Sequence, residues 1–239
     1  ICNYTAEREL LARGLVAGRR FVIFGRRDTG KTSLLKSCVV PRLKRKGLFV
    51  CFADLFGVRT LEQLCERLQS GVEQGMKDFS PSRARLEGLL RLVQSVRPVL
   101  TTDPQEGVLV SLTVMPDGCA PQLAQLFKSV ADIHRKHGCV LVLDEFQDIH
   151  FVPQAEALLR DAFQNLPRGL GIAILGSKQH LLGRIFGRPQ APLAGFGEDF
   201  VLPPLPYDEF HAYIATRLKH RRISLSLETA TYLQDRLQR

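Results

Sequence analysis

A run of eight residues, 25–32, has the composition and spacing that phosphate binding requires. It reads Gly-Arg-Arg-Asp-Thr-Gly-Lys-Thr and fits the pattern G-x-x-x-x-G-K-[ST]. Glycines let backbone N–H groups curl around phosphate oxygens, because no Cβ blocks the approach. We expect Lys31 to reach the β- and γ-phosphates and Thr32 to ligate Mg²⁺. The expected nucleotide-binding residues are Gly25, Arg26, Arg27, Asp28, Thr29, Gly30, Lys31, Thr32 and Ser33.

A second candidate group is acidic and follows an apolar run. Residues 139–143 read Cys-Val-Leu-Val-Leu, and Asp144 and Glu145 come next. An aspartate at the end of a buried strand can hold Mg²⁺, directly or through water. The adjacent glutamate can orient the attacking water or accept its proton. Many strands end in acidic residues that only form part of a turn. This Walker B-like pattern therefore indicates a metal site chiefly because the same chain also has a phosphate loop.

These residues need strands and helices to position them. Residues 20–24 form a short apolar run that predicts a strand ending at Gly25, and a helix should follow from about Lys31. A strand before the loop and a helix after it disfavour the alternative of a glycine-rich turn with an exposed lysine. Pro41 should end or kink that helix near Val40.

Further apolar runs alternate with segments of helical periodicity. Alternation of strands and helices implies right-handed crossovers and a parallel sheet. A β-hairpin is predicted within 97–116, where two apolar runs flank a polar turn, and we interpret it as an insertion. The other strands are expected at 48–54, 139–143, 170–175 and 199–202, and the helices at 60–73, 83–95, 121–137, 154–165, the start of 178–188 and, as a pair, within 207–239.

Composition and charge set broad limits on the chain. Its 239 residues suit one large α/β domain or a domain with a small appendage. The net charge of +9 is compatible with an anionic partner. No motif that reads nucleic-acid bases is evident, so we favour the interpretation that the basic residues form a solvated surface and that some of the arginines bind phosphate. None of the six cysteines forms a C-x-x-C pair, and we expect them to be reduced.

The compartment follows from the same composition. The sequence shows no secretory leader and no apolar run near the roughly 18 residues that a membrane span needs. We therefore expect a cytoplasmic protein without a membrane partner. The start at Ile1 and the end inside a helical run at Arg239 leave open that a leader or further domains are missing.

The motifs together resemble the AAA+-related P-loop ATPases of the archaeal-ATPase and STAND type, relatives of the origin-recognition ATPases. The resemblance covers most of the chain, and its most specific part is Asp-Glu-Phe-Gln at 144–147. The matching stretches are GRRDTGKTSL at 25–34, FADL at 52–55, LVLDEFQDI at 141–149, ILGS at 174–177 and LPPL at 202–205.

This resemblance implies a three-layer α/β/α fold with a five-stranded parallel sheet in the order 5-1-4-3-2. One strand then lies between the phosphate-loop strand and the strand that ends in Asp144. It also implies ATP rather than GTP, in agreement with the lack of an evident Asn/Thr-Lys-x-Asp guanine reader. Residues 1–205 would form the ATPase core with its hairpin insertion, and 206–239 would begin a helical lid.

Further site residues are implied by the same resemblance. Ser177 is a sensor-1 candidate that could touch the γ-phosphate or the attacking water, and the alternative is a helix N-cap. Arg184 and Arg188 lie where an arginine finger is found in such ATPases, and the alternative is a solvated basic helix. Residues 203–206, rich in proline, would lie near the adenine, although packing explains them equally well.

The chain departs from the family pattern at both ends. The usual Phe-x-Gly-Arg-Glu before the first strand is replaced by residues 4–10, with Ala6 where the arginine would fall. The arginine with which the family helps to hold the base therefore has no counterpart at position 6. We do not expect residues 206–239 to include the winged-helix domain that usually follows such a core, because they suffice only for the start of a helical lid.

The leading hypothesis is an ATPase, with slow turnover, that couples nucleotide state to a partner protein or a second copy of the chain. Its catalytic residues would be Lys31, Glu145, Ser177 and one of the two arginines, its metal ligands Thr32 and Asp144, and its cofactors ATP and Mg²⁺. The alternatives are a DNA-binding initiator or helicase loader and a nucleotide-gated signalling scaffold. A small-molecule kinase is a weaker rival.

Overall fold

The computed structural model describes residues 4–25, 29–79, 97–103, 107–113, 118–203, 206–219 and 223–238. The helix expected at 83–95 lies outside these residues. So do three members of the phosphate loop, Arg26, Arg27 and Asp28, and part of the proline-rich stretch 203–206.

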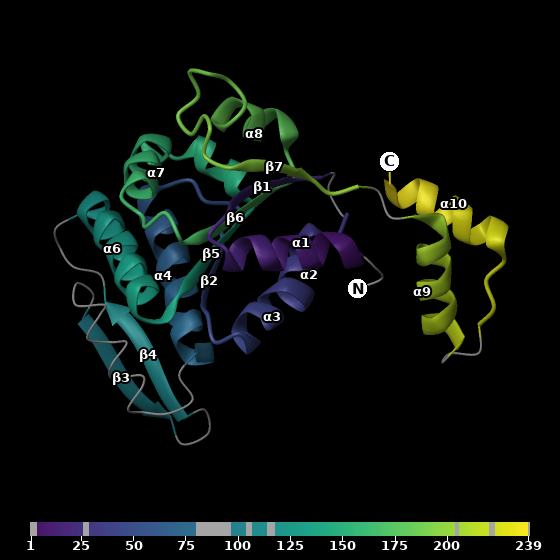
Figure 1. The fold of residues 1–239 in the computed structure, drawn as a ribbon, viewed down its shortest axis with the longest axis horizontal. Coiled ribbons are helices and arrows are strands. Elements are labelled where there is room, and N and C mark those ends of the chain that lie inside the picture. Colours follow the sequence, from purple (N-terminus) through teal and green to yellow (C-terminus); the bar gives the residue numbers. More distant parts are fainter. Residues whose placement is uncertain are drawn as a thin grey trace.

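A five-stranded parallel sheet forms the centre of the fold (Figure 1). Its strands run in the order β2-β5-β6-β1-β7, which is 5-1-4-3-2 when the strands of this sheet are numbered along the chain, and this order confirms the predicted topology. Every strand predicted for this sheet is present to within one residue at each end. The bounds are Arg20–Phe24 for β1, Phe49–Asp54 for β2, Cys139–Asp144 for β5, Gly171–Gly176 for β6 and Glu198–Val201 for β7.

Helices cover both faces of this sheet, so each central strand is buried on two sides. In β5, Val140 and Val142 pack with the helices of one face, while Leu141 and Leu143 pack with those of the other. This two-sided burial explains why the strands read as continuous apolar runs. One face carries α1 (Thr5–Val16), α2 (Lys31–Leu34) and α3 (Val40–Arg45), and the other carries α4 (Leu61–Phe79), α6 (Cys119–His137), α7 (Ala155–Gln164) and α8 (Gln179–Ile185).

The helix after the phosphate loop was expected to end or kink near Val40, and it does not end there. It changes to π-helical hydrogen bonding over Leu35–Val39 and returns to α-helical geometry at Val40. Pro41 lies in the first turn of α3, where its missing N–H costs little. The predicted kink is therefore a local change in helical winding, and the helical segment continues to Arg45.

Helix α1 was not predicted from the sequence. Leu11 and Leu15 are buried, but Leu10 is 44% and Val16 is 39% exposed. Apolar residues thus lie around the whole helix and blur the amphipathic period that identifies a helix in a sequence.

Two segments stand outside the main sheet. Strands β3 (Arg97–Asp103) and β4 (Gly107–Thr113) pair antiparallel as a separate two-stranded sheet, which confirms the predicted hairpin. Helices α9 (Tyr207–Lys219) and α10 (Leu227–Gln238) are the expected C-terminal pair, and they lie to one side of the sheet (Figure 1). No helix in the described part of the chain combines the length and the apolar character needed to span a membrane.

Candidate functional site

The phosphate loop leaves the carboxyl end of β1 and enters α2. Gly30 precedes the helix with φ +83°, a conformation that favours glycine. The ammonium of Lys31 donates a hydrogen bond to the carbonyl oxygen of Gly25 at 2.8 Å. The lysine side chain is therefore folded back across the loop and is almost fully buried. A buried cation and a helix amino end face the same loop, which is an arrangement suited to binding phosphate.

Thr32 and Asp144 are brought together from positions 112 residues apart in the chain. The Thr32 hydroxyl donates to Oδ2 of Asp144 at 2.7 Å. Asp144 ends β5, two strands away from β1, so the contact depends on the order of strands in the sheet. A hydroxyl and a carboxylate at this distance are oxygen donors of the kind that Mg²⁺ takes in proteins.

The carboxylate of Asp144 is 2% exposed. Burial raises the pKa of Asp144 above its ordinary value, and hydrogen bonds from Thr32 and from the Glu145 N–H oppose this rise. The negative charges of Asp54 and Glu145 raise the pKa further. Asp54 is the register partner of Asp144 across β2 and β5. A divalent cation would relieve this concentration of negative charge, so the carboxylates fit the expected metal.

Glu145 follows Asp144 in a strained backbone conformation. Its φ is +50° and its ψ is +38°, in the left-handed region that non-glycine residues rarely adopt. Such strain persists where surrounding contacts hold it, often at functional sites. Here the Oε2 atom of Glu145 accepts hydrogen bonds from the Gln147 amide and, at 3.1 Å, from the Ser177 hydroxyl. The carboxylate is thereby held between the ends of β5 and β6.

Ser177 lies directly after β6 and faces Glu145. Its hydroxyl donates to Glu145, and its N–H donates to Oε1 of Gln147 at 3.2 Å. The alternative of a helix N-cap is not supported, because α8 has Lys178 at its N-cap and no capping side chain. The structure therefore joins the sensor-1 candidate to the acidic strand end.

Arg184 and Arg188 are not joined to this group by any hydrogen bond or ion pair within the described residues. Arg184 lies on α8, Arg188 follows it, and both side chains are exposed. Their exposure is compatible with contact to another molecule. Their assignment as arginine fingers stays a prediction.

Tyr4 was not identified as a candidate from the sequence. The Tyr4 side chain is buried, and its hydroxyl lies 2.8 Å from the carbonyl oxygen of Pro203 and 3.4 Å from that of Thr29. This tyrosine links the N-terminal segment, the phosphate loop and the exit of β7. The proline-rich stretch therefore begins beside the loop. A single aromatic residue before a helix gives no sequence signal for such a contact.

Asp148 is a second buried carboxylate near the site that sequence reasoning missed. It accepts hydrogen bonds from the Gly57 N–H at 2.9 Å and from the Lys178 ammonium at 3.1 Å. Asp148 lies in the short 3₁₀-helix Phe146–Phe151, so it ties this turn to the segments after β2 and β6. Nearby, the ring of Phe151 is 45% exposed and lies 4.7 Å below the guanidinium of Arg59.

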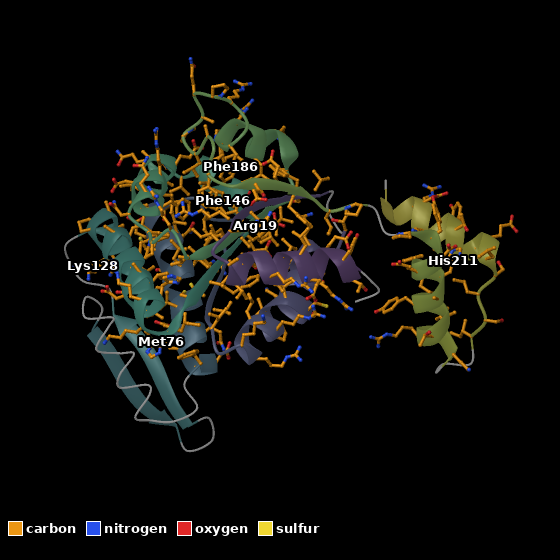
Figure 2. The ribbon with its side chains drawn as sticks, in the orientation of Figure 1. Arg19, Met76, Lys128, Phe146, Phe186 and His211 are labelled. Atoms are coloured by element: carbon orange, nitrogen blue, oxygen red, sulfur yellow. The ribbon has the colours of Figure 1, made fainter. Side chains whose placement is uncertain are left out.

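The same turn is anchored from behind by aromatic packing. The rings of Phe146 and Phe186 lie 5.6 Å apart within the core, and both are labelled among the packed side chains of Figure 2. Phe146 is fully buried. The turn that carries Gln147 and Asp148 is therefore fixed on its inner side.

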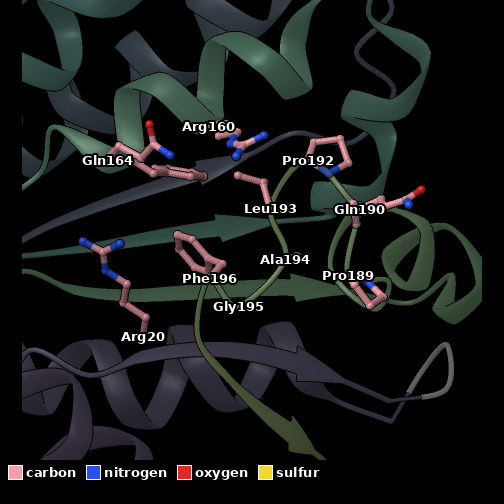
Figure 3. Close-up of a pocket in the computed structure, with 12 residues that line it drawn as sticks. Arg20, Arg160, Gln164, Pro189, Gln190, Pro192, Leu193, Ala194, Gly195 and Phe196 are labelled. Carbon is pink, nitrogen blue, oxygen red and sulfur yellow. The ribbon is translucent and has the colours of Figure 1, made fainter.

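A cavity of about 450 Å³ lies elsewhere in the fold (Figure 3). Its lining includes Arg20, Arg160 and Phe196, with the Arg20 guanidinium 5.5 Å from the Phe196 ring. Arg20 begins β1, whereas the phosphate loop follows the end of that strand. The cavity is therefore at the opposite end of β1 and separate from the candidate site.

Searches among protein-family models and among curated protein sequences find no match to this chain. Solved structures do match it. One is the Aeropyrum pernix ORC2 protein in ADPNP–ADP complexes. The alignment covers 90% of this chain and 51% of the ORC2 chain, with a TM-score of 0.56 and 19% identity. Another is CDC6P from Pyrobaculum aerophilum. That alignment covers 91% of this chain and 50% of the CDC6P chain, with a TM-score of 0.55 and 14% identity.

A third similar structure is the Aeropyrum pernix ORC1 protein in complex with DNA. It aligns with 90% of this chain and 49% of its own, with a TM-score of 0.54 and 17% identity. The chain thus spans about half the length of the structures that it matches. Over most of its length it shares the fold of these ORC and CDC6P structures, and its own main sheet is five-stranded and parallel, in the order 5-1-4-3-2.

Proposed function

We propose that this chain binds Mg-ATP at the carboxyl ends of β1 and β5 and hydrolyses the bound ATP slowly. The observation that carries the proposal is the hydrogen bond of 2.7 Å between Thr32 and Asp144. Two separate sequence motifs predicted a metal ligand each, and their oxygens meet in the fold. The fold of AAA+ ATPases supports nucleotide binding as the general class of activity.

Each residue of the site has a distinct role in this proposal. Lys31 and the loop amides hold the phosphates, and Thr32 and Asp144 hold Mg²⁺, which neutralises charge on the phosphate oxygens. Glu145 orients the attacking water or accepts its proton. Ser177 holds the Glu145 carboxylate through its hydroxyl. Arg184 or Arg188 stabilises transition-state charge in a neighbouring copy of the chain.

The nucleotide state would be passed on to a partner by movement of the C-terminal helices. We infer that residues 1–205 form the ATPase core, and that α9 and α10 begin a lid. In Figure 1 these two helices lie to one side of the main sheet. A protein partner or a second copy of this chain would respond to that movement in the cytoplasm.

A DNA-binding, initiator-like ATPase is the second candidate. The net charge of +9 favours it, as does the exposed ring of Phe151 beside Arg59. Cations bind the DNA backbone and an exposed aromatic ring can stack on a base. The similar ORC1 structure is described in complex with DNA. A nucleotide-gated scaffold with little turnover is the third candidate.

ATP hydrolysis by the wild type and by Glu145→Gln, each with and without DNA, tests the proposal. The wild type should release phosphate only with Mg²⁺, and Glu145→Gln should lose about 10²–10⁴-fold in rate while still binding Mg-ATP. Glu66→Gln, an exposed glutamate on α4, is the matched control and should keep the wild-type rate.

The outcomes separate the three candidates. Stimulation by DNA that weakens with salt would favour the initiator-like function. Binding of Mg-ATP without measurable turnover, together with a rise in molecular mass on binding, would favour the scaffold. If the wild type neither binds nor hydrolyses Mg-ATP, the proposed function is wrong.

A further inference from the structure

Gln147 occupies a fully buried position between the ends of β5 and β6. Its Nε2 group donates to Oε2 of Glu145, and its Oε1 atom accepts the N–H of Ser177 at 3.2 Å. One side-chain amide therefore donates a hydrogen bond to the candidate general base and accepts one from the residue that follows the neighbouring strand. An amide suits this double use, because an ionised carboxylate lacks the donor, and a methionine thioether has no donor and is only a weak acceptor.

The residue facing Gln147 is a glycine for a steric reason. A Cβ atom built on Gly176 would lie 2.3 Å from Oε1 of Gln147 and 2.6 Å from Cδ1 of Leu182. The φ of Gly176 is not in the positive range that would itself favour glycine. The absence of a side chain at 176 thus makes room for the amide, which is an observation independent of the hydrogen bonds.

The amide and the Ser177 hydroxyl both donate to the same carboxylate oxygen, Oε2 of Glu145. Within the described part of the chain, no side chain or backbone group hydrogen-bonds the other oxygen, Oε1, which leaves it to accept a hydrogen bond from water. We propose that Gln147 is a positioning residue for Glu145: it fixes the carboxylate so that Oε1 meets the attacking water. This inference rests on the proposed ATPase function.

The backbone at Glu145 shows why positioning is needed. Its left-handed conformation is strained, and a strained segment relaxes when the contacts that hold it are removed. Loss of the Gln147 amide would let the carboxylate turn away from the water. A misplacement of about 1 Å in a reacting group can cost roughly 10²-fold in rate.

Two substitutions separate positioning from packing. Gln147→Met keeps the volume and removes both hydrogen-bonding ends, whereas Gln147→Glu keeps the shape and replaces the donor by an acceptor. Both should lower kcat by roughly 10–10²-fold, with the KM for ATP and the Kd for Mg-ATP unchanged. Gln164→Glu, an exposed glutamine on α7, makes the same charge change away from the site and should behave as the wild type.

Several outcomes would overturn the inference while leaving the ATPase function intact. Wild-type turnover in both Gln147 variants would do so. So would an equal loss of kcat and of Mg-ATP affinity in both variants, because that pattern marks a purely structural role. If Gln147→Glu does not fold, Gln147→Met alone decides the question: a reduced kcat with unchanged Mg-ATP affinity supports the inference. Wild-type protein without ATPase activity would instead refute the proposed function itself.

Discussion

A methyl group at position 176 should disturb both the stability and the activity of this chain. In Gly176→Ala, the new Cβ would lie 2.3 Å from Oε1 of Gln147 and 2.6 Å from Cδ1 of Leu182. Ordinary contacts begin near 3.4 Å, so the neighbours must move by about 1 Å. Both neighbours are fully buried, so the close packing of the interior opposes that movement. Overpacking of this kind costs about 1–3 kcal/mol.

That cost translates into a measurable shift in Tm. For a chain of this size, about 1 kcal/mol lowers Tm by roughly 2–4 °C, so the expected decrease is roughly 2–12 °C. The displaced Gln147 amide should also lose its contact with Glu145, and kcat for ATP should fall by roughly 10-fold or more. Differential scanning fluorimetry and a phosphate-release assay measure the two effects.

Gly183→Ala is the matched control on the adjacent helix. A Cβ there would meet no atom within 4 Å, and the position lies inside α8. Removing the conformational freedom of this glycine should stabilise the fold by about 0.4–1 kcal/mol without changing kcat. Equal Tm values and equal rates for the two alanine variants would show that Gly176 does not face Gln147 as described.

Three further predictions concern the rest of the site. Burial raises the pKa of Asp144, so proton binding favours the folded chain, and stability without ligand should fall as the pH rises from the ordinary aspartate value through the raised one. Mg²⁺ affinity, measured by titration calorimetry, should rise over the same window, and Asp144→Asn should abolish both effects. Tyr4→Phe removes a hydrogen bond to Pro203 and should lower Tm by roughly 2–4 °C, for a loss of about 1 kcal/mol. If Arg184 or Arg188 acts on a neighbouring copy, its alanine variant should lose the increase of specific activity with protein concentration, whereas an unchanged increase would argue against a finger.

The strands of the main sheet could be predicted because each is a short apolar run with a clear end. Residues 139–143, for example, are buried on both faces, and Asp144 marks the carboxyl end. Their order could not be derived from such runs, because periodicity carries no information about which strand lies beside which. The resemblance to known ATPases supplied the order, and with it the meeting of Thr32 and Asp144.

Other features depend on packing that a sequence does not display. Helix α1 carries apolar residues on its exposed side, and Pro41 is accommodated by a change in winding within the preceding helix. The role of Gln147 was hidden because its amide contacts Ser177, which lies 30 residues away in the chain, after a different strand. Such contacts become visible only when the neighbouring strand and the small residue that admits the side chain are both known.

Titration calorimetry with Mg-ATP on the wild type and on Lys31→Ala tests the nucleotide site most directly. The wild type should bind in a Mg²⁺-dependent manner, and Lys31→Ala should bind roughly 10–150-fold more weakly, for the loss of about 1.5–3 kcal/mol in charged hydrogen bonds. Lys128→Ala, at an exposed lysine on α6, should match the wild type. Equal Mg-ATP affinity in the wild type and in Lys31→Ala would contradict a phosphate site at this loop.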